Sequence, residues 1–430
     1  MKSAASSEGP IELERREEPP REDVWPLLVP LGKVCAINPR REPGLDRADD
    51  APTSFVPMSA VDDRSGTIRN LHDRPFCEVR KGYTYFEDGD VIFAKITPCM
   101  QNGKQAVCEG LRGGFGFGST EFHVIRPGPA VAAKWVHYFV RRPDILDRAV
   151  HAFTGSAGQQ RLPESFLQEL KIPLPPLVVQ ERIAARLTEQ LAIVERARAA
   201  AAERLAAAEA LPRAFLRKVF GRAKNNGWNS RRIGEICNLL PSKSIASSGD
   251  AEVRAITTAC LTEFGFSHSG IKTARMHASD VAACTMQPGE VLIARSNTPE
   301  LVGRASLYPG GPEAIVASDL TIRLWARAGD DSVLPSYLAT YMSFLFQTGY
   351  WKERAGGASR SMKKITRTQL SAEVVPLPPM ETQRRIAAGL ADRISSAGRL
   401  ARELRAELAA IDALPAALLR SAFGHAQPSV

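Results

Sequence analysis

One segment of about fifty residues occurs twice in this chain of 430 residues. The first copy begins at Ile172–Leu177 (IPLPPL) and the second at Val375–Met380 (VPLPPM), and both continue as alanine- and arginine-rich helical patterns. Pro173 corresponds to Pro376 (376 − 173 = 203), and the same offset relates Gln180 to Gln383. A constant offset without a gap indicates one structural unit used twice.

Apolar residues within each copy recur at an average spacing of about 3.5 residues, the period of a coiled coil. The first copy has small residues where the second has bulky ones, so we expect the two helices to pair within one chain. The alternative is that each helix packs on its own domain. The expected contact positions are Ile183, Leu187, Leu191, Val194, Ala197, Ala201, Leu205, Ala208 and Leu211 in the first copy, and Ile386, Leu390, Ile394, Ala397, Leu400, Leu404, Leu408, Ile411 and Leu414 in the second.

The segments that precede the two helices form a second, looser repeat. Gly89–Lys95 matches Gly289–Arg295 at an offset of 200 (289 − 89 = 200). Short β-type runs alternate with turn residues, which indicates mixed α+β domains. The predicted order along the chain is a disordered tail (1–23), a first domain (24–171), a first helical region (172–222), a second domain (223–374), a second helical region (375–424) and a tail (425–430). The proline motifs are expected to act as stiff hinges.

Local patterns predict three elements of the first domain: strands at Tyr83–Phe86 and Val91–Ala94, and a helix at Trp135–Ala149. The fold class is therefore α+β, with two mixed domains separated by two long helices that pair as an antiparallel coiled coil in an internal pseudo-twofold repeat. The 56 Lys and Arg residues against 47 Asp and Glu residues give a net charge of +9, which favours polyanionic partners.

The cysteine pattern and the hydropathy pattern indicate the cellular compartment in which the chain is expected. Its seven cysteines form no C-x-x-C pair and their number is odd, which fits reduced thiols better than disulfides or zinc ligands. No stretch approaches the roughly 20 apolar residues that a membrane span requires. We therefore expect a cytoplasmic protein.

Enzyme motifs are scarce. The chain lacks a G-x-x-x-x-G-K-[ST] loop, and Gly113–Gly118 lacks the spacing of a dinucleotide-binding loop. One alternative remains open: Pro143-Asp144 followed by Glu169-x-Lys171 spells the pattern of a metal-dependent nuclease, in which carboxylates hold a divalent ion. The histidines show no ligand spacing, so core or surface roles are expected for them.

Two pairs of polar, cationic loops are the stronger signal. Loop 1 (Lys95–Lys104) and its repeat, loop 1′ (Arg295–Arg304), follow matching strands, whereas loop 2 (Thr154–Arg161) and loop 2′ (Gly356–Lys364) precede the proline motifs. Lys and Arg contact phosphates or guanine edges, and Thr, Asn and Gln distinguish bases. The candidate DNA-binding residues are Lys95, Thr97, Gln101, Asn102, Lys104, Ser156, Gln159, Gln160, Arg161, Arg295, Ser296, Asn297, Thr298, Arg304, Arg360, Lys363 and Lys364.

These segments resemble the specificity (S) subunit of Type I restriction-modification systems, the HsdS family. The residues that carry the resemblance are Asp90–Lys104, Gly118–Phe122, Gly155–Arg161 and Ile172–Leu177 with Gln180, Arg182 and Ile183. The second domain departs from this pattern, since Arg295–Pro299 stands where Lys95–Pro98 does and Gln159–Arg161 has no clear partner. Its DNA target is therefore expected to differ.

The resemblance implies a non-catalytic subunit that recognises a bipartite, asymmetric site on double-stranded DNA. It implies two methyltransferase (M) subunits and restriction (R) subunits as partners, with S-adenosylmethionine, ATP and Mg²⁺ on those partners and no cofactor on this chain. A helix of about 30 residues is about 45 Å long, enough to hold two readers about one DNA turn apart. Candidates for methyltransferase docking, or equally for helix-end packing, are Arg213, Phe215, Leu216, Arg217, Lys218, Phe220, Leu418, Leu419, Arg420 and Phe423.

Two other classes of protein stay open from the sequence. One is a self-contained nuclease that uses Asp144, Glu169 and Lys171. The other is a coiled-coil scaffold for proteins alone, which would show no salt-sensitive affinity for duplex DNA.

Overall fold

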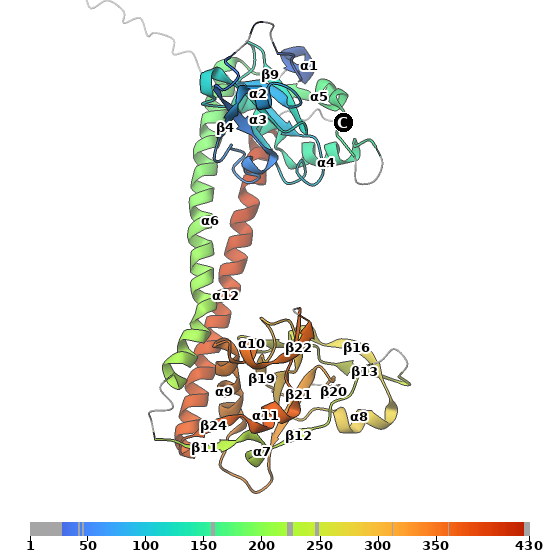
Figure 1. Ribbon diagram of the computed structural model, residues 1–430, viewed down its shortest axis with the longest axis vertical. Coiled ribbons are helices and arrows are strands. Elements are labelled where there is room, and N and C mark those ends of the chain that lie inside the picture. The colour runs from blue at the N-terminus through green and yellow to red at the C-terminus, as the bar shows by residue number, and fades with distance from the viewer. Residues whose placement is uncertain are drawn as a thin grey trace, which may run out of the picture. The chain divides into compact units, whose positions relative to one another are not determined.

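The structure, a computed structural model, describes residues 28–41, 44, 47–155, 160–221, 227–245, 249–311, 313–359 and 361–424. The chain divides into two compact units, and each contains one α+β domain and a segment of both long helices (Figure 1). The first unit holds residues up to Ala199 and those from Ala409 onward, whereas the second holds Ala200–Leu408. The predicted tails, 1–23 and 425–430, lie outside the described residues.

Two four-stranded sheets form the first domain. The order of the first sheet is β2-β9-β6-β7, with neighbours antiparallel; its strands are β2 (Cys35–Ile37), β9 (Phe122–Pro127), β6 (Val91–Ala94) and β7 (Gln105–Val107). The order of the second is β4-β3-β8-β5, with β3 and β8 parallel; its strands are β4 (His72–Pro75), β3 (Pro52–Val56), β8 (Phe115–Gly118) and β5 (Thr84–Glu87). The strands predicted at Tyr83–Phe86 and Val91–Ala94 are confirmed as β5 and β6, and they belong to different sheets.

The second domain repeats this topology with one strand fewer among its described residues, since no strand there corresponds to β5. One sheet has the order β12-β21-β17-β19, from β12 (Cys237–Leu240), β21 (Thr321–Ala326), β17 (Val291–Ala294) and β19 (Ala305–Leu307). The other has the order β16-β13-β20, from β16 (Lys272–Met276), β13 (Ala251–Ala255) and β20 (Ile315–Val316), with β13 and β20 parallel. Equivalent strands occupy equivalent places, so the domain repeat predicted from the sequence is confirmed.

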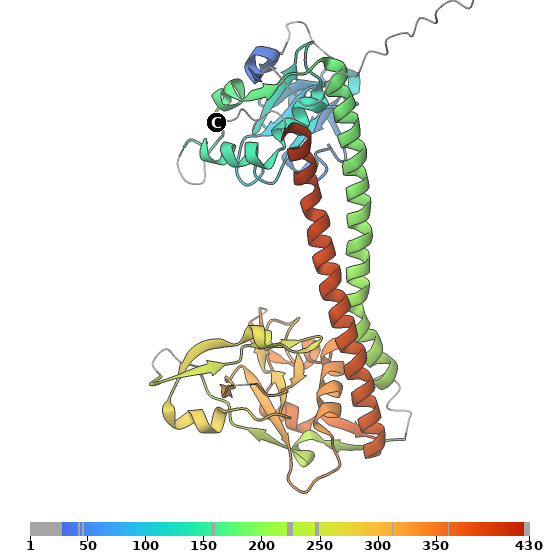
Figure 2. The same ribbon diagram turned by 180° about the vertical axis from the view of Figure 1, so that it is seen from behind.

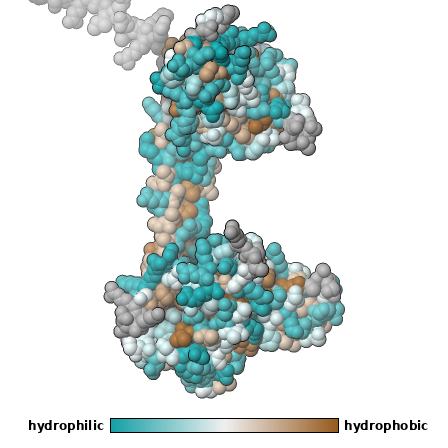
Figure 3. Space-filling view, viewed as in Figure 1, coloured by the Kyte–Doolittle hydropathy of each residue, from teal (hydrophilic) through white to brown (hydrophobic). Residues whose placement is uncertain are grey.

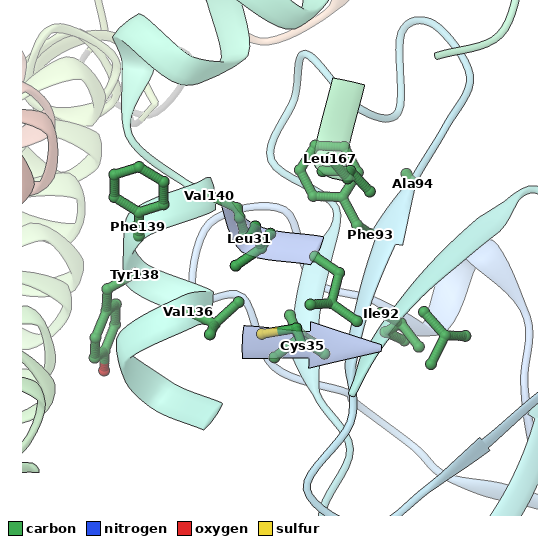
Figure 4. Packing of buried hydrophobic residues seen from close by; sticks show 14 of the residues in the cluster. Leu31, Cys35, Ile92, Phe93, Ala94, Val136, Tyr138, Phe139, Val140 and Leu167 are labelled. Carbon is green, nitrogen blue, oxygen red and sulfur yellow. The ribbon is translucent and has the colours of Figure 1, made fainter. Parts of the chain in front are cut away.

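The core of the first domain lies between the β2-β9-β6-β7 sheet and the helices beside it (Figure 4). All four residues of β6 are buried, because its side chains meet packing partners on both faces of the sheet. The predicted helix at Trp135–Ala149 is instead two helices, α3 (Ala133–Val140) and α4 (Pro143–His151). Pro143 is the first residue of α4, a position that its fixed φ angle suits, whereas it cannot continue α3.

The proline motifs form edge strands and are not the stiff hinges that were predicted, so that part of the prediction is wrong. β10 (Lys171–Pro173) pairs antiparallel with β1 (Leu28–Pro30), and β24 (Val374–Leu377) pairs antiparallel with β11 (Asn229–Arg232). Proline tolerates an edge strand because its missing N–H is not needed there. Each motif therefore joins the end of its domain to the beginning of that domain.

The two long helices, α6 (Leu177–Phe220) and α12 (Met380–Phe423), have 44 residues each and start 203 residues apart (380 − 177 = 203). Within the second unit, Arg204 bonds to Glu407 at 2.9 Å and Glu209 to Arg405, so the numbers rise along one helix and fall along the other. Figures 1 and 2 show the helical segments of each unit side by side. The antiparallel pairing is confirmed. No helix in the described ranges is long and apolar enough to span a membrane.

The contact line between the helices differs in part from the predicted one. Ala208 packs with Ala401 and Leu404, so a small residue does meet a large one. However, Ala197 is exposed, and Leu400 and Leu414 are 41% and 43% exposed, so these positions were predicted wrongly. In an alanine-rich helix, neighbouring residues fit a 3.5-residue spacing equally well. Only the packing in the folded protein determines which of them lie at the helix contact.

A buried glutamine fixes the start of each long helix. Gln180 donates from Nε2 to the carbonyl oxygens of Ala130 (3.0 Å) and Pro175 (2.8 Å), and its Oε1 accepts from the Ala132 N–H (3.0 Å). Gln383 makes the equivalent three bonds, to Ser332, Pro378 and Leu334. The glutamines are 0% and 1% exposed. Their repetition in the sequence therefore reflects a structural clamp between helix, proline motif and domain.

We expect Gln180→Leu to lower the free energy of unfolding of the first unit by about 2–4 kcal/mol, because it leaves a buried N–H and buried carbonyls unpaired. Urea unfolding of the full chain measures this change. The matched control is Gln168→Leu, which removes only an exposed bond to Glu164 and should cost less than about 0.5 kcal/mol. Equal effects of the two substitutions would show that the clamp is not a stabilising feature.

Candidate nucleic-acid interface

Loops 1 and 2 of the first domain, which are far apart in the sequence, meet at one end of strand β6. The Leu162 N–H donates to the carbonyl of Lys95 at 2.9 Å, and Arg161 forms β-bridges with Ile96 and Thr154. The Lys95 N–H donates to the carbonyl of Glu121 at 2.9 Å. The fold therefore gathers Lys95, Glu121 and Arg161 from three segments into one polar surface.

Glu121 and Arg161 form a two-bond ion pair on this surface, with Nε–Oε2 and Nη2–Oε1 distances of 2.9 and 2.7 Å. Hydrogen bonds from Arg161 lower the pKa of Glu121; burial opposes this, and the charges of Arg161 and Lys95 add to it. The same bonds raise the pKa of Arg161. The pair holds loop 2 against the start of β9, so it orders the surface and offsets part of its positive charge.

The second domain builds the same framework from different side chains. The Ile365 N–H donates to the carbonyl of Arg295 at 2.8 Å, as Leu162 does to Lys95. β18 (Ser296–Asn297) pairs with β23 (Met362–Lys364), which pairs with β22 (Gly356–Ser359). Lys364 therefore takes the place of Arg161 (364 − 161 = 203), an equivalence that the sequence alone did not reveal.

The second domain has less negative charge at this place. The Arg295 N–H donates to the carbonyl of Leu320, the position that Glu121 has in the first domain. Lys363 and Lys364 have no carboxylate partner among the residues that the structure describes. Burial lowers the pKa of Arg367, and the nearby charge of Arg295 lowers it further. The Arg367 guanidinium donates to the main-chain carbonyls of Leu239 and Leu240, which hold its positive charge close to that of Arg295.

Two of the cations predicted to contact DNA, Lys104 and Arg304, instead bond to main-chain carbonyls of their own domain. Lys104 donates from Nζ to the carbonyls of Met58 (3.2 Å) and Val61 (2.7 Å), and Arg304 donates from Nη1 to the carbonyl of Leu261 (3.2 Å). The two carbonyl positions correspond at the offset of 200 (261 − 61 = 200). Both cations therefore fasten loop 1 or loop 1′ to its neighbouring segment, which explains why a cation recurs there.

The remaining predicted polar residues divide by exposure. Thr97, Gln101 and Asn102 of loop 1 are exposed, and Gln160 of loop 2 is exposed beside Arg161. Ser296, Asn297 and Thr298 of loop 1′ are half-buried, and the Asn297 side chain accepts from the Thr298 N–H at 2.9 Å. Ser156, Gln159 and Arg360 lie outside the described residues. Hydrophilic residues predominate on the face shown in Figure 3, with hydrophobic residues in small patches.

Four of the residues proposed for partner docking are core residues. Leu216 and Phe220 are buried in the second unit, and Leu419 and Phe423 are buried in the first, where Phe423 packs on Trp135 at a ring distance of 4.3 Å. The docking interpretation is wrong for these four, and the helix-end packing alternative is correct. Phe215 and Leu418 are half-buried, whereas the cations of the set are exposed: Arg213, Arg217, Lys218 and Arg420.

The nuclease alternative gains no support from the geometry. Both carboxylate oxygens of Asp144 accept from Arg142, at 2.9 and 2.8 Å. Glu169 ends the short helix α5 (Glu164–Glu169), and Lys171 begins edge strand β10. Within the described part of the chain, no three His, Cys, Asp or Glu residues lie close enough to hold a metal ion.

The fold and the loops together define a duplicated, two-domain α+β protein in which each domain presents a cationic, polar loop pair. Residues 31–204 match the family model of the Type I restriction modification DNA specificity domain. The resemblance stated from the sequence is thereby confirmed for this part of the chain, which covers most of the first domain and more than half of α6.

Two curated relatives from Escherichia coli match one part of the chain. The Type I restriction enzyme EcoAI specificity subunit is 37% identical over 183 residues, which cover 42% of this chain and 30% of that protein. The EcoEI specificity subunit is 39% identical over 156 residues, which cover 36% of this chain and 26% of that protein. The chain thus matches less than a third of the length of either relative.

Solved structures match over nearly the whole chain. A chain from a structure concerned with complex assembly and conformational transition of the type I R-M system has a TM-score of 0.72 at 24% identity, covering 92% of this chain and 97% of that chain. The HsdS subunit from Thermoanaerobacter tengcongensis has a TM-score of 0.56 at 24% identity, covering 92% and 96%. These likenesses establish the fold of both domains and the helix pair.

The pair between Glu121 and Arg161 predicts a pH dependence of loop 2. Because the folded-state pKa of Glu121 is lowered, the pair stabilises the loop above the ordinary glutamate pKa of about 4.3 and loses this effect as pH falls through the lowered value. Hydrogen exchange at the Arg161 and Leu162 amides, corrected for intrinsic rates, should therefore accelerate between about pH 5 and pH 3. Glu121→Gln should remove this acceleration; a variant that still shows it would contradict the assignment.

Proposed function

We propose that this chain is the non-catalytic, sequence-specific DNA-binding subunit of a Type I restriction-modification complex. Each domain would read one half of a bipartite, asymmetric site through its own pair of loops. The observation that carries this proposal is the convergence of loops 1 and 2, and of loops 1′ and 2′, on equivalent main-chain frameworks with different side chains. The match of residues 31–204 to a DNA specificity domain supports the same function.

The chemistry of the two loop pairs fits duplex DNA. Lys95 and the β23 lysines supply positive charge for phosphates, and the exposed amides of Gln101 and Asn102 supply the paired donors and acceptors that read base edges. Because Glu121 is replaced by Leu320 and Arg161 by Lys364, the two domains present different donors and would prefer different bases.

We further propose that methyltransferase subunits dock on this chain and carry the chemistry, with S-adenosylmethionine, ATP and Mg²⁺ bound by partner subunits. The EcoAI and EcoEI relatives are specificity subunits of restriction enzymes, which supports partners of this kind. The exposed cations near the helix ends, Arg213, Arg217, Lys218 and Arg420, stay candidates for the docking surface. The link between helix length and half-site spacing stays a prediction.

Exchange of residues 24–171 for the equivalent domain of a relative tests the proposed function. The methylated sequence of cells that carry the chimaera should change in one half and remain the same in the other, because each domain reads independently. Methylation-sensitive sequencing of the host genome measures both halves at once. A change in both halves, or in neither, would refute the modular function.

The two lysines of loop 1 should differ in their effect on salt dependence. Lys95→Met should reduce the slope of log K against log salt for duplex DNA by about one, as expected for the loss of one phosphate contact. Lys104→Met should leave the slope unchanged and lower the stability of the domain, because Nζ bonds to two main-chain carbonyls. Titrations at several salt concentrations distinguish the two, and equal slopes for both variants would remove Lys95 from the interface.

A further inference from the structure

An arginine outside the predicted site holds loop 1 in place. The break between α3 and α4 leaves Arg141 as the residue that caps α3. Its Nη1 donates to the carbonyl oxygens of Gly103 (2.6 Å) and Gln105 (3.3 Å), and its Nη2 donates to those of Asp63 (3.0 Å) and Arg64 (2.7 Å). One guanidinium group therefore joins the end of loop 1 to a turn some 40 residues earlier in the chain.

The surroundings of Arg141 leave little room for another arrangement. A side chain on Gly103 would approach the Asp63 carbonyl to 2.8 Å, and one on Gly66 would approach the Arg141 guanidinium to 2.5 Å. Both glycines also have positive φ angles, 85° and 65°. The turn itself is closed by Asp62, which accepts from the N–H and the hydroxyl of Ser65 at 2.7 Å.

No carboxylate in the described part of the chain bonds to the Arg141 guanidinium. Burial lowers its pKa to about 10, the weaker influences of Tyr138, Asp62 and Asp63 act in the opposite direction, and the group stays protonated at neutral pH. Burial, with the charges of Arg141 and Lys134, holds the pKa of the neighbouring His137 imidazole well below its ordinary value. A planar group with five donors in a fixed geometry suits four carbonyl acceptors, and a lysine cannot reproduce it.

The second domain lacks this clamp. Ser343 occupies the equivalent position (343 − 141 = 202). Its hydroxyl bonds to the carbonyl of Ala305 at 3.2 Å, the counterpart of the Gln105 bond, and to the Ala339 carbonyl of its own helix at 2.9 Å. There Trp351 packs directly against Gly303, whose added side chain would approach the indole to 2.3 Å. The arginine clamp is therefore a property of loop 1, not of the shared framework.

We propose that Arg141 is a positioning residue for DNA recognition by the first domain. It fixes the main chain directly after Gln101 and Asn102, whose exposed amides are the base-reading candidates of loop 1. Directional hydrogen bonds to bases require their donors within a few tenths of an ångström, so a loosened loop loses discrimination before it loses charge-based affinity. This inference rests on the proposed function.

Selection from a random-sequence DNA duplex library tests the inference with the full-length chain. Wild type should select a bipartite sequence, and the domain exchange identifies the half that the first domain reads. Arg141→Lys and Arg141→Met should lose roughly tenfold in discrimination at that half only, the size expected for one mispositioned base contact. Affinity for unrelated duplex should stay within about twofold of wild type, because the phosphate contacts remain.

Arg142→Lys is the matched control. This arginine lies at the same helix break, bonds to Asp144 and stacks over Phe139 and Phe423. Its side chain makes no hydrogen bond or ion pair to the described residues of loop 1 or of the Asp62–Thr67 turn. It should lower thermal stability and leave both halves of the selected sequence unchanged. Ser343→Ala, in the second domain, should likewise leave the half assigned to the first domain unchanged.

Two outcomes would overturn the assignment of Arg141. One is an unchanged selected sequence for both Arg141 variants; the other is an equal loss at both halves, which would indicate a general structural role. If wild type selects no sequence at all, the proposed function itself fails, so the two failures are separable.

Discussion

The connection between each domain and the long helix that follows it depends on one buried glutamine, Gln180 or Gln383. Its hydrogen bonds fix the direction in which the helix leaves the domain. Gln180 and Gln383 satisfy both donors and the acceptor of a primary amide without water. Such a site tolerates few substitutes, because each missing group leaves a buried main-chain partner unpaired. The clamp joins the first turn of a long helix to the strand that closes its domain, and this explains why the helical repeat is strict whereas the domains have diverged.

In the loops, the main-chain hydrogen bonds are the same in both domains, whereas the side chains differ. The carbonyls of Lys95 and Arg295 accept equivalent hydrogen bonds, and the strands that carry them pair in the same order. The side chains on that framework change from acid to leucine at Glu121 and from arginine to serine at Arg141. A constant framework with variable donors allows one fold to bind different sequences, because specificity depends on the side chains and positioning depends on the backbone.

The sequence predicted the features that follow from periodicity and repetition. The offset of 203 residues, the antiparallel helices and the repeated loops needed only pattern and register, whereas the convergence of loop 1 with loop 2 is a finding of the structure. The exact contact line could not be predicted, because Ala397, Leu400 and Ala401 all satisfy a helical period and only packing selects among them. Lys104 and Arg304 were predicted as DNA contacts because the sequence alone does not distinguish a cation that binds a phosphate from one that bonds to a main-chain carbonyl. Arg141 carried no signal, since its four partners are main-chain atoms.

Charge pairing gives the two domains different electrostatic character within the same framework. In the first domain Glu121 offsets Arg161, and Arg141 is surrounded by carbonyl dipoles. The exposed polar residues of loop 1 are then Thr97, Gln101 and Asn102, and Lys95 is half-buried. In the second, Lys363, Lys364, Arg295 and Arg367 gather where the acid has been lost. Attraction to phosphate falls steeply with salt, whereas directional bonds to bases depend mainly on geometry. The charge of the first-domain surface is therefore partly neutralised by the domain itself, whereas Lys363 and Lys364 of the second domain have no carboxylate partner among the described residues.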